Sequence, residues 1–287
     1  MDYKFKTKPY EHQIKALGAC HNKENFALFM EMGTGKSKVL IDNIAMLHDR
    51  GKINSALIVA PKGVYRNWEK QEIPTHMPEH VPYKIIVWNP SSNKFLKDYG
   101  AFIKDQDNLK IFLINIDAFS TSKGQEIAKR FLISTQCLMA IDESTTIKSP
   151  TAKRTKTVCN LRTYAKYRRI LTGSPVTKSP LDLYTQCYFL DPELLGFSSY
   201  YSFKNRYAVM ISRSVATHSF KQIVDYQRLD ELESKLNQFS YRVLKSECLD
   251  LPDKVYTKRY IEMTPEQKKA YIEMKNFAIS VLEKQTV

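Results

Sequence analysis

Short runs of apolar residues alternate with longer amphipathic stretches along the first two-thirds of the chain. The apolar runs are rich in Ile, Val, Leu and Phe, which predicts buried strands. They lie at Phe26–Met30, Ala56–Ala60, Lys84–Trp88, Ile111–Ile116, Cys137–Ile141 and Arg169–Thr172. Apolar residues recur at helical spacing, which predicts helices, at about residues 10–20, 36–50, 64–73, 123–134 and 179–190. Strands that alternate with helices predict an α/β fold, in which a parallel sheet is covered by helices on both faces.

The last third of the chain has a different pattern. From about Phe197 onward the apolar spacing is helical and charged residues are frequent, with a short hairpin expected at Ser212–Tyr226 and a final helix from Thr264. We therefore predict a sheet domain over residues 1–195 and a mainly helical extension over residues 196–287.

Composition and charge narrow the class of protein. With 43% hydrophobic residues, the 287-residue chain can bury a substantial core and is not a disordered chain. Its formal net charge of +14 suits a polyanionic partner, and nucleic acid is the first candidate. Excess lysine also serves solubility, so that charge alone leaves both interpretations open.

The five cysteines are scattered and never form a C-x-x-C pair, which argues against disulfides or a zinc site. The chain begins without an apolar signal core, and no apolar run approaches the roughly 18 residues of a membrane span. We expect a soluble, intracellular protein that has no contact with a membrane.

The stretch between Phe26 and Ser37 carries the most specific chemical signal. A predicted strand leads into a Gly-Thr-Gly-Lys-Ser loop, and a predicted helix begins at once, so that backbone N–H groups would face a phosphate group. We expect the phosphate-binding residues to be Met32, Gly33, Thr34, Gly35, Lys36 and Ser37. Lys36 would reach the β- and γ-phosphates, and the Ser37 hydroxyl would ligate Mg²⁺. The long form of this motif has a glycine where this chain has Met30, so that a glycine-containing helix start is the alternative.

Two adjacent carboxylates, Asp142 and Glu143, follow the apolar run Cys137–Ile141. Side chains at the carboxyl ends of parallel strands face the ligand crevice. We predict that Asp142 holds Mg²⁺ through water and that Glu143 polarises the attacking water, because phosphoryl transfer depends mainly on positioning and charge stabilisation. Acids also cap helices, and the phosphate loop upstream is what favours the catalytic interpretation.

Four further stretches lie in a fixed order around the loop and the carboxylates. They are Pro9–Gln13, Ala56–Trp68, Asp142–Lys156 and Arg169–Pro175. With the loop, they resemble the motifs of the first motor lobe of superfamily-two helicases and translocases, and most closely those of the Swi/Snf-type DNA-dependent ATPases. The resemblance covers about residues 9–275 and implies a RecA-like fold, ATP and Mg²⁺ as ligands, and double-stranded DNA as the partner.

The resemblance also implies roles for individual residues. Gln13 occupies the position of the family's adenine-reading glutamine. The residues expected to contact nucleic acid are Lys62, Arg66, Asn115 and Lys148. The residues expected to couple nucleotide state to the grip on nucleic acid are Thr172, Gly173 and Ser174. Thr145 stands where the family usually has histidine, which implies a different coupling between the second and third motifs.

The stretch Lys148–Arg169 is basic, contains no acid and includes interleaved tyrosines. Contacts from such residues to phosphates give salt-dependent, sequence-independent affinity. Its basic members are Lys148, Lys153, Arg154, Lys156, Arg162, Lys166, Arg168 and Arg169. A solvated basic helix face is the alternative interpretation.

The extension resembles the family's run towards a second lobe. The matching stretches are Tyr226–Leu232, Tyr241–Lys245, Leu251–Lys254 and Thr264–Gln267. We expect the remaining motifs, including an arginine finger, to lie in a second RecA-like lobe that these 287 residues do not include. Because that arginine supplies much of the transition-state stabilisation, we expect this lobe alone to bind ATP but to hydrolyse it weakly or not at all.

Together these features predict the ATP-binding lobe of an ATP-dependent translocase on double-stranded DNA, located in the cytoplasm, the nucleoid or the nucleus. Three alternatives stay open. A strand-separating RNA or DNA helicase would need a wedge element. A small-molecule kinase would need an arginine-rich lid and would leave the flanking motifs unexplained. A nucleic-acid-binding scaffold would bind ATP without useful hydrolysis.

Overall fold

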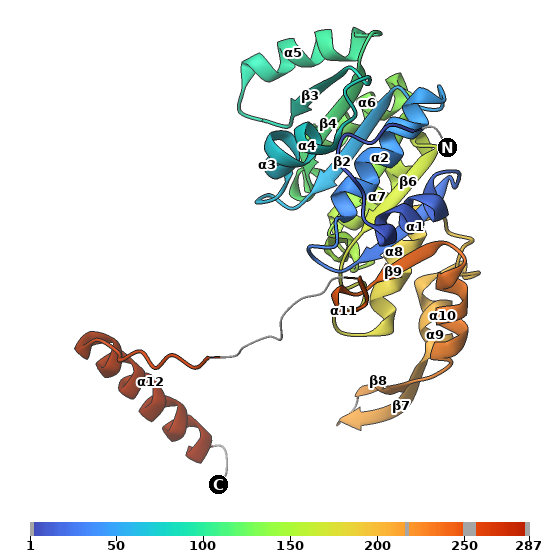
Figure 1. Ribbon diagram of the computed structural model, residues 1–287. Helices are drawn as coiled ribbons and strands as arrows, with labels where there is room; N and C mark the ends of the chain where they lie inside the picture. The colour runs from blue at the N-terminus through green and yellow to red at the C-terminus, as the bar shows by residue number, and fades with distance from the viewer. Residues whose placement is uncertain (1–2, 216–217, 249–256, 285–287) are drawn as a thin grey trace. The chain divides into compact units, whose positions relative to one another are not determined.

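The computed structural model describes residues 3–215, 218–248 and 257–284 (Figure 1). They belong to two compact units, residues 1–250 and residues 251–287. The described part of the second unit contains helix α12 (Pro265–Lys284), which confirms the final helix predicted from Thr264. The stretch Leu251–Lys254, expected to lead towards a second lobe, lies outside the described residues.

A seven-stranded parallel sheet forms the centre of the first unit. The strands are β1 (Asn25–Met30), β2 (Ser55–Ala60), β3 (Tyr83–Val87), β4 (Leu109–Asn115), β5 (Cys137–Asp142), β6 (Tyr167–Leu171) and β9 (Ser240–Val243). Their order is β3-β4-β2-β5-β6-β1-β9. The first six are the strands that the apolar runs predict. The central strands β2 and β5 are buried along their whole length, which is why their sequences are almost entirely apolar.

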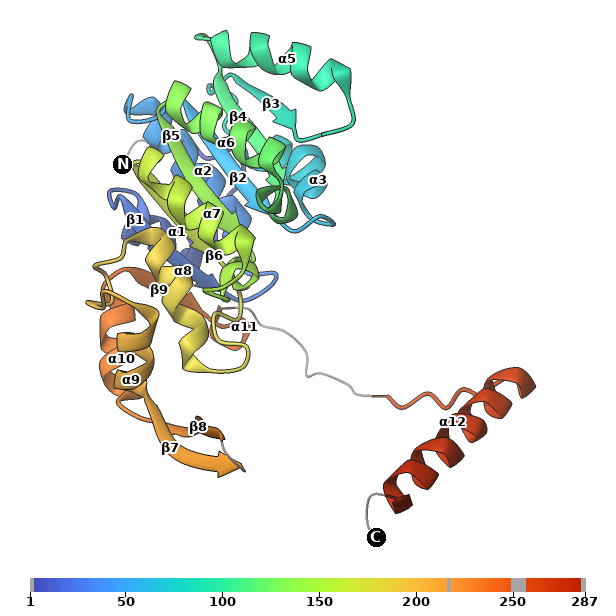
Figure 2. The same cartoon turned by 180° about the vertical axis from the view of Figure 1, so that it is seen from behind.

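Helices cover both faces of this sheet, which confirms the α/β class (Figure 1, Figure 2). The helices of the first unit are α1 (Glu11–Cys20), α2 (Lys36–Asp49), α3 (Tyr65–Asn67), α4 (Ile73–His76), α5 (Asn93–Lys104), α6 (Ser122–Ser134), α7 (Lys153–Leu161), α8 (Leu183–Leu190), α9 (Tyr200–Tyr207), α10 (Leu229–Asn237) and α11 (Lys245–Cys248). Short 3₁₀ turns occupy Ile116–Ser120, Ser144–Ile147, Arg162–Tyr164 and Pro180–Asp182.

Alternate side chains of each strand serve two separate cores. In β1, Leu28 and Met30 pack with α1 and α2, whereas Ala27 and Phe29 pack with α6, α7 and α8. This alternation follows from the period of two residues in a strand. The sheet is therefore held from both sides, and the loops at the carboxyl ends of its strands rest on a rigid support.

The predicted helix over residues 64–73 is divided in the structure. A π-type turn (Trp68–Glu72) separates α3 from α4, and Pro74 follows within α4. Proline has no N–H to donate to a preceding carbonyl, which explains the widened turn before it. Helices α5 and α7 were not among the predicted helices, although α5 buries Phe95, Tyr99 and Phe102 at helical spacing.

The C-terminal part of the first unit contains more strand than we predicted. The hairpin expected at Ser212–Tyr226 is longer, and consists of β7 (Ala208–Val215) and β8 (His218–Tyr226). β9 joins the main sheet beside β1, with Ala27 opposite Ser240 and Met30 opposite Val243. The first compact unit therefore extends to residue 250 rather than ending at residue 195.

All five cysteines are free thiols, as their spacing predicts. Within the described ranges, no helix is both long enough and apolar enough to cross a membrane.

Candidate active site

The loop between β1 and α2 has the geometry of a phosphate-binding loop. Gly33 and Gly35 have φ angles of +85° and +83°, a region that favours glycine because it has no Cβ. α2 begins at Lys36, directly after Gly35, and no side chain of the described residues caps its first turn. The N–H groups of that turn are therefore available to an anion placed above the loop.

Contacts from the N-terminal helix hold this loop in place. The N–H and the hydroxyl of Thr34 both donate to the carbonyl of Glu31, at 3.1 and 2.7 Å. Gln13 donates from Nε2 to the carbonyl of Thr34 at 3.1 Å, and its Oε1 accepts the N–H of Tyr10 at 3.0 Å. A Cβ at Gly35 would lie 2.2 Å from Gln13 Nε2. Each end of the Gln13 amide thus keeps one hydrogen-bonding position for a base.

The two predicted carboxylates lie at the same edge of the sheet as the loop. Glu143 Oε1 is 3.2 Å from Lys36 Nζ, and Ser37 follows Lys36 in the first turn of α2. Asp142 is only 4% exposed and accepts a 2.9 Å hydrogen bond from Trp68 Nε1. Burial raises the pKa of Asp142, although Trp68 and Lys36 oppose that shift. Glu143 has a φ of +48°, a strained conformation that is common where a side chain is aimed at a ligand.

The segment after β6 closes the site from a third direction. The hydroxyl of Thr172 donates to Glu143 Oε2 at 3.4 Å and accepts the N–H of Ser174 at 3.2 Å. A Cβ at Gly173 would lie 3.1 Å from the backbone nitrogen of Met32, so that this segment approaches the phosphate loop closely. The link between the second and third motifs is therefore made by Glu143 itself, whereas Thr145 lies in the 3₁₀ turn that follows.

The sequence identifies Trp68 only as a residue of a motif. In the structure its indole N–H contacts Asp142 specifically. Replacing Trp68 by phenylalanine keeps most of the buried aromatic volume but leaves Asp142 without this donor. We expect the free energy of unfolding to fall by about 2 kcal/mol, measured by urea denaturation. Trp88→Phe is the matched control, because Trp88 is also buried but its indole N–H donates to no acceptor of the described residues. Equal effects of the two changes would contradict the prediction.

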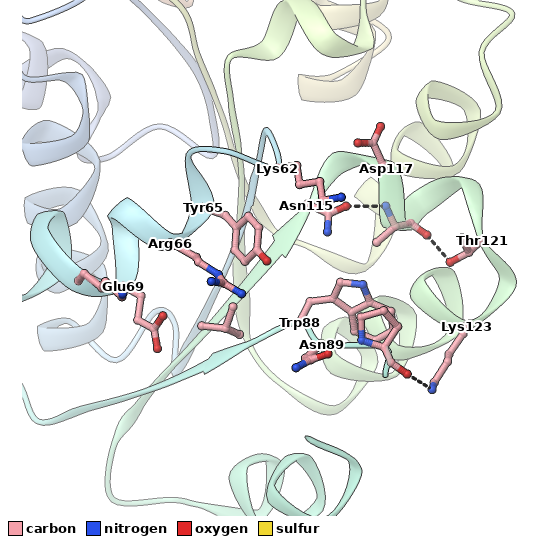
Figure 3. Close-up of a pocket in the computed structure, with 14 residues that line it drawn as sticks. Lys62, Tyr65, Arg66, Glu69, Trp88, Asn89, Asn115, Asp117, Thr121 and Lys123 are labelled. Atoms are coloured by element: carbon pink, nitrogen blue, oxygen red, sulfur yellow. Dashed lines mark hydrogen bonds between the residues drawn. The ribbon is translucent and has the colours of Figure 1, made fainter. Parts of the chain in front are cut away.

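Lys62, Arg66 and Asn115 lie together around one hollow with a volume of about 660 Å³ (Figure 3). The cations that line it are Lys62, Arg66, Lys70 and Lys123. Asn115, the last residue of β4, accepts the N–H of Ala118 at 2.9 Å, and its amide N–H groups stay available. The carboxylates of Glu69 and Asp117 also line it, so that cations outnumber anions by four to two around the hollow.

Lys148 lies apart from that hollow. Its ammonium is hydrogen-bonded to the Thr177 hydroxyl and lies 3.8 Å from the carboxylate of Asp182. Asp182 also accepts the N–H groups of Thr177 and Lys178, at 3.0 and 2.9 Å. Burial alone would raise the pKa of Asp182, but these hydrogen bonds outweigh it and hold the pKa below its usual range. In this structure Lys148 thus stabilises the loop that follows Ser174.

The lowered pKa of Asp182 predicts a pH-dependent contribution to stability. The contribution is complete above the unfolded-state pKa of about 4 and is lost as the pH falls through the lower folded-state pKa. We expect Asp182→Asn to cost about 1–2 kcal/mol at neutral pH and much less near pH 3. Thermal unfolding across this pH range measures the difference, with the exposed Asp107→Asn as control. A cost that is the same at both pH values would contradict the prediction.

Arg169 does not belong to the basic surface that the sequence predicts for Lys148–Arg169. Its side chain is completely buried and donates hydrogen bonds to protein acceptors, so it cannot contact nucleic acid. Arg154 pairs with Asp117 at 3.2 Å. Lys153 and Lys156 on α7 are exposed. The middle of this stretch therefore forms a solvated basic helix face, and its end forms part of the core.

Sequence reasoning assigned no role to Glu31 or Lys245 at this site. The N–H of Glu31 donates to the carbonyl of Val243 at 3.0 Å, and its Oε2 accepts the N–H of Lys245 at 2.8 Å. These residues lie 214 positions apart in the chain. No local pattern predicts such a contact, because it depends on the pairing of β9 with β1.

The sheet order, the phosphate loop and the carboxylate pair define the phosphate-binding lobe of a RecA-like protein. The chain belongs to the SNF2-related domain family, whose family model matches residues 11–287. It is 28% identical over 283 residues to the chromatin-remodeling ATPase INO80 of Candida albicans, and 24% identical over 257 residues to the chromatin remodeling factor mit1 of Schizosaccharomyces pombe. These matches cover 93% and 88% of this chain, but only 19% and 16% of those proteins.

Solved structures show the same likeness. The SWI2/SNF2 ATPase core of Sulfolobus solfataricus in complex with dsDNA superposes with a TM-score of 0.65 at 25% identity. The match covers 99% of this chain and 55% of that chain. The RecA-like fold and the Swi/Snf resemblance predicted from the motifs are therefore confirmed.

Proposed function

We propose that this chain is the ATP-binding lobe of an ATP-dependent translocase on double-stranded DNA. Hydrolysis would be coupled to movement when a second RecA-like lobe is present. The single observation that carries the proposal is the convergence of three residues at one sheet edge, where Glu143 contacts Lys36 at 3.2 Å and Thr172 at 3.4 Å. Three segments that belong to different motifs thus meet where a terminal phosphate would be held.

The donor set around Asp142 fits a magnesium ion. Mg²⁺ is usually held by one or two carboxylates together with phosphate oxygens and waters, and Asp142 with the Ser37 hydroxyl supplies the protein share of such a set. The buried carboxylate of Asp142 also lacks a direct ion-pair partner among the described residues. When bound, Mg²⁺ would neutralise charge that develops on the phosphates.

The pairing of Lys36 with Glu143 suggests how the site responds to ATP. A phosphate group placed on the loop competes with Glu143 for the Lys36 ammonium, since both are anions. Once Lys36 turns to the phosphate, Glu143 is free to accept a hydrogen bond from the attacking water and to orient it. Because Thr172 is hydrogen-bonded to Glu143, a movement of Glu143 would also move Thr172 and the segment that follows it.

The proposed DNA contact lies in the hollow lined by Lys62, Arg66 and Asn115. Its cations would bind backbone phosphates without reading sequence, as a translocase requires. The Sulfolobus relative in complex with dsDNA supports duplex DNA as the ligand class. Such a protein would act inside the cell, where DNA is accessible.

ATP turnover by the chain tests the proposal, measured with duplex DNA, single-stranded DNA, RNA or no nucleic acid, at low and high salt. Stimulation by duplex DNA that is lost at high salt would support a translocase lobe. Mg²⁺-dependent ATP binding and salt-sensitive DNA binding without turnover would support a lobe that needs its partner lobe. Stronger stimulation by RNA or single strands would favour a strand-separating helicase instead. Binding of neither ligand would refute the proposal.

A further inference from the structure

Lys245 brings a second cation to the phosphate loop from the C-terminal part of the first unit. A Cβ placed on Gly33 would lie 3.2 Å from Lys245 Cε and 3.3 Å from Lys245 Nζ. The ammonium therefore lies directly against the loop residue that must adopt a positive φ.

The position of Lys245 is fixed by its backbone. Its N–H donates to Glu31 Oε2 at 2.8 Å, and the preceding strand β9 is paired with β1, which leads into the loop. The N–H of Glu31 in turn donates to Val243 at 3.0 Å. Two hydrogen bonds and one strand pair thus hold the start of α11 beside the phosphate loop.

The charge of Lys245 has no partner in the part of the chain that the structure describes. No carboxylate or carbonyl of the described residues lies within ion-pair or hydrogen-bonding distance of its ammonium, although the side chain is half-buried. Lys36, the other lysine of the loop, is in contrast paired with Glu143. A half-buried ammonium with three unused donors beside an anion-binding loop suits a phosphate oxygen.

We propose that Lys245 is a ligand of the nucleotide phosphates, in addition to Lys36. This inference rests on the proposed nucleotide site and adds a contact that the loop motif does not contain. Because Lys245 begins α11, the phosphate chain would also link the loop to this helix.

ADP binding in the presence of Mg²⁺ tests this inference on the full chain, by calorimetric titration and by thermal unfolding with and without ADP. We expect Lys245→Ala to raise the Kd for ADP by about tenfold, the effect of losing one charge-assisted hydrogen bond. Lys245→Arg should keep most of the affinity. The matched control is Lys52→Ala, which removes an exposed charge past the opposite end of α2, roughly 20 Å away by the rise of a helix.

The unfolding midpoint without ADP separates ligand contact from structural support. We expect it to be unchanged in Lys245→Ala, whereas the rise produced by ADP becomes smaller. An unchanged Kd for ADP would overturn the inference and leave the proposed function intact. If Lys245→Ala lowered the unfolding midpoint without ADP and also weakened ADP binding, the inference would be overturned. Lys245 would then support the structure of the loop rather than contact the nucleotide. If the unaltered chain bound no nucleotide, the proposed function itself would fail.

Discussion

Lys36→Ala is expected to abolish measurable ATP binding, a loss of about 100-fold or more. The ammonium of Lys36 is mostly buried, with 11% of its side chain exposed, and lies at the start of α2 where the helix dipole already favours an anion. A charge-assisted contact to phosphate at a mostly buried position contributes more to the free energy of binding than a contact at an exposed surface. Titration of a fluorescent ATP analogue in the presence of Mg²⁺ measures the loss.

Glu143→Gln is the informative companion to this variant. It removes the anion that competes for Lys36 but keeps the side-chain shape, so that ATP affinity should be unchanged or higher. Turnover should be lost in a form of the protein that includes the second lobe, because a neutral amide orients the attacking water poorly. Normal ATP affinity in Lys36→Ala would refute the assignment of the loop, and normal turnover in Glu143→Gln would refute the role of the carboxylate.

The sequence predicts the first six strands well because all of them except the edge strand β3 are almost completely buried. A parallel sheet between two helical layers requires nearly continuous apolar runs, and β2 and β5 contain almost nothing else. The phosphate loop is equally easy to predict from the sequence, because a positive φ at Gly33 and Gly35 restricts which residues can occupy these positions. Both features depend on residues that are neighbours in the chain.

The features that the sequence did not reveal depend on distant contacts. β9 has only four residues with a mixed burial pattern, and it becomes a strand because β1 offers an unpaired edge. The contact of Lys245 with the loop follows from that pairing. Trp68 is recognisable as a motif residue, but its hydrogen bond to Asp142 spans 74 positions. Local periodicity carries no information about such pairs.

Arg169 shows the same difficulty within the basic stretch. A run of cations with no acid suggests a surface for nucleic acid, yet the last cation of the run points into the core. Its partners include backbone carbonyls near the end of α1 and the start of β1 and the Oδ1 of Asn43 on α2. These acceptors are uncharged and leave no signal in the composition. Charge patterning alone therefore cannot separate a surface cation from a buried one.

Arg169→Met is expected to lower the free energy of unfolding by about 3 kcal/mol or more. The guanidinium donates to the carbonyls of Cys20, Lys23 and Glu24 at 3.0, 2.7 and 2.8 Å, and to Asn43 Oδ1 at 3.0 Å. Methionine fills much of the volume but supplies none of these donors. The Oδ1 of the fully buried Asn43 would then be unsatisfied, as its Nδ2 already is among the described residues.

Urea denaturation measures this loss, and Lys153→Met on the exposed face of α7 is the control for removing a positive charge. We expect the control to change the free energy of unfolding by less than about 0.5 kcal/mol. Arg169→Lys should recover only a small part of the loss, because an ammonium cannot present the planar fork of donors that spans several acceptors at once. If Arg169→Met unfolded at the same urea concentration as the control, these hydrogen bonds would not stabilise the junction of α1 with β1. The position of the loop between those elements would then depend on the packing of Cys20 and Phe26 and on hydrogen bonds such as that from the N–H of Arg168 to the carbonyl of Glu24.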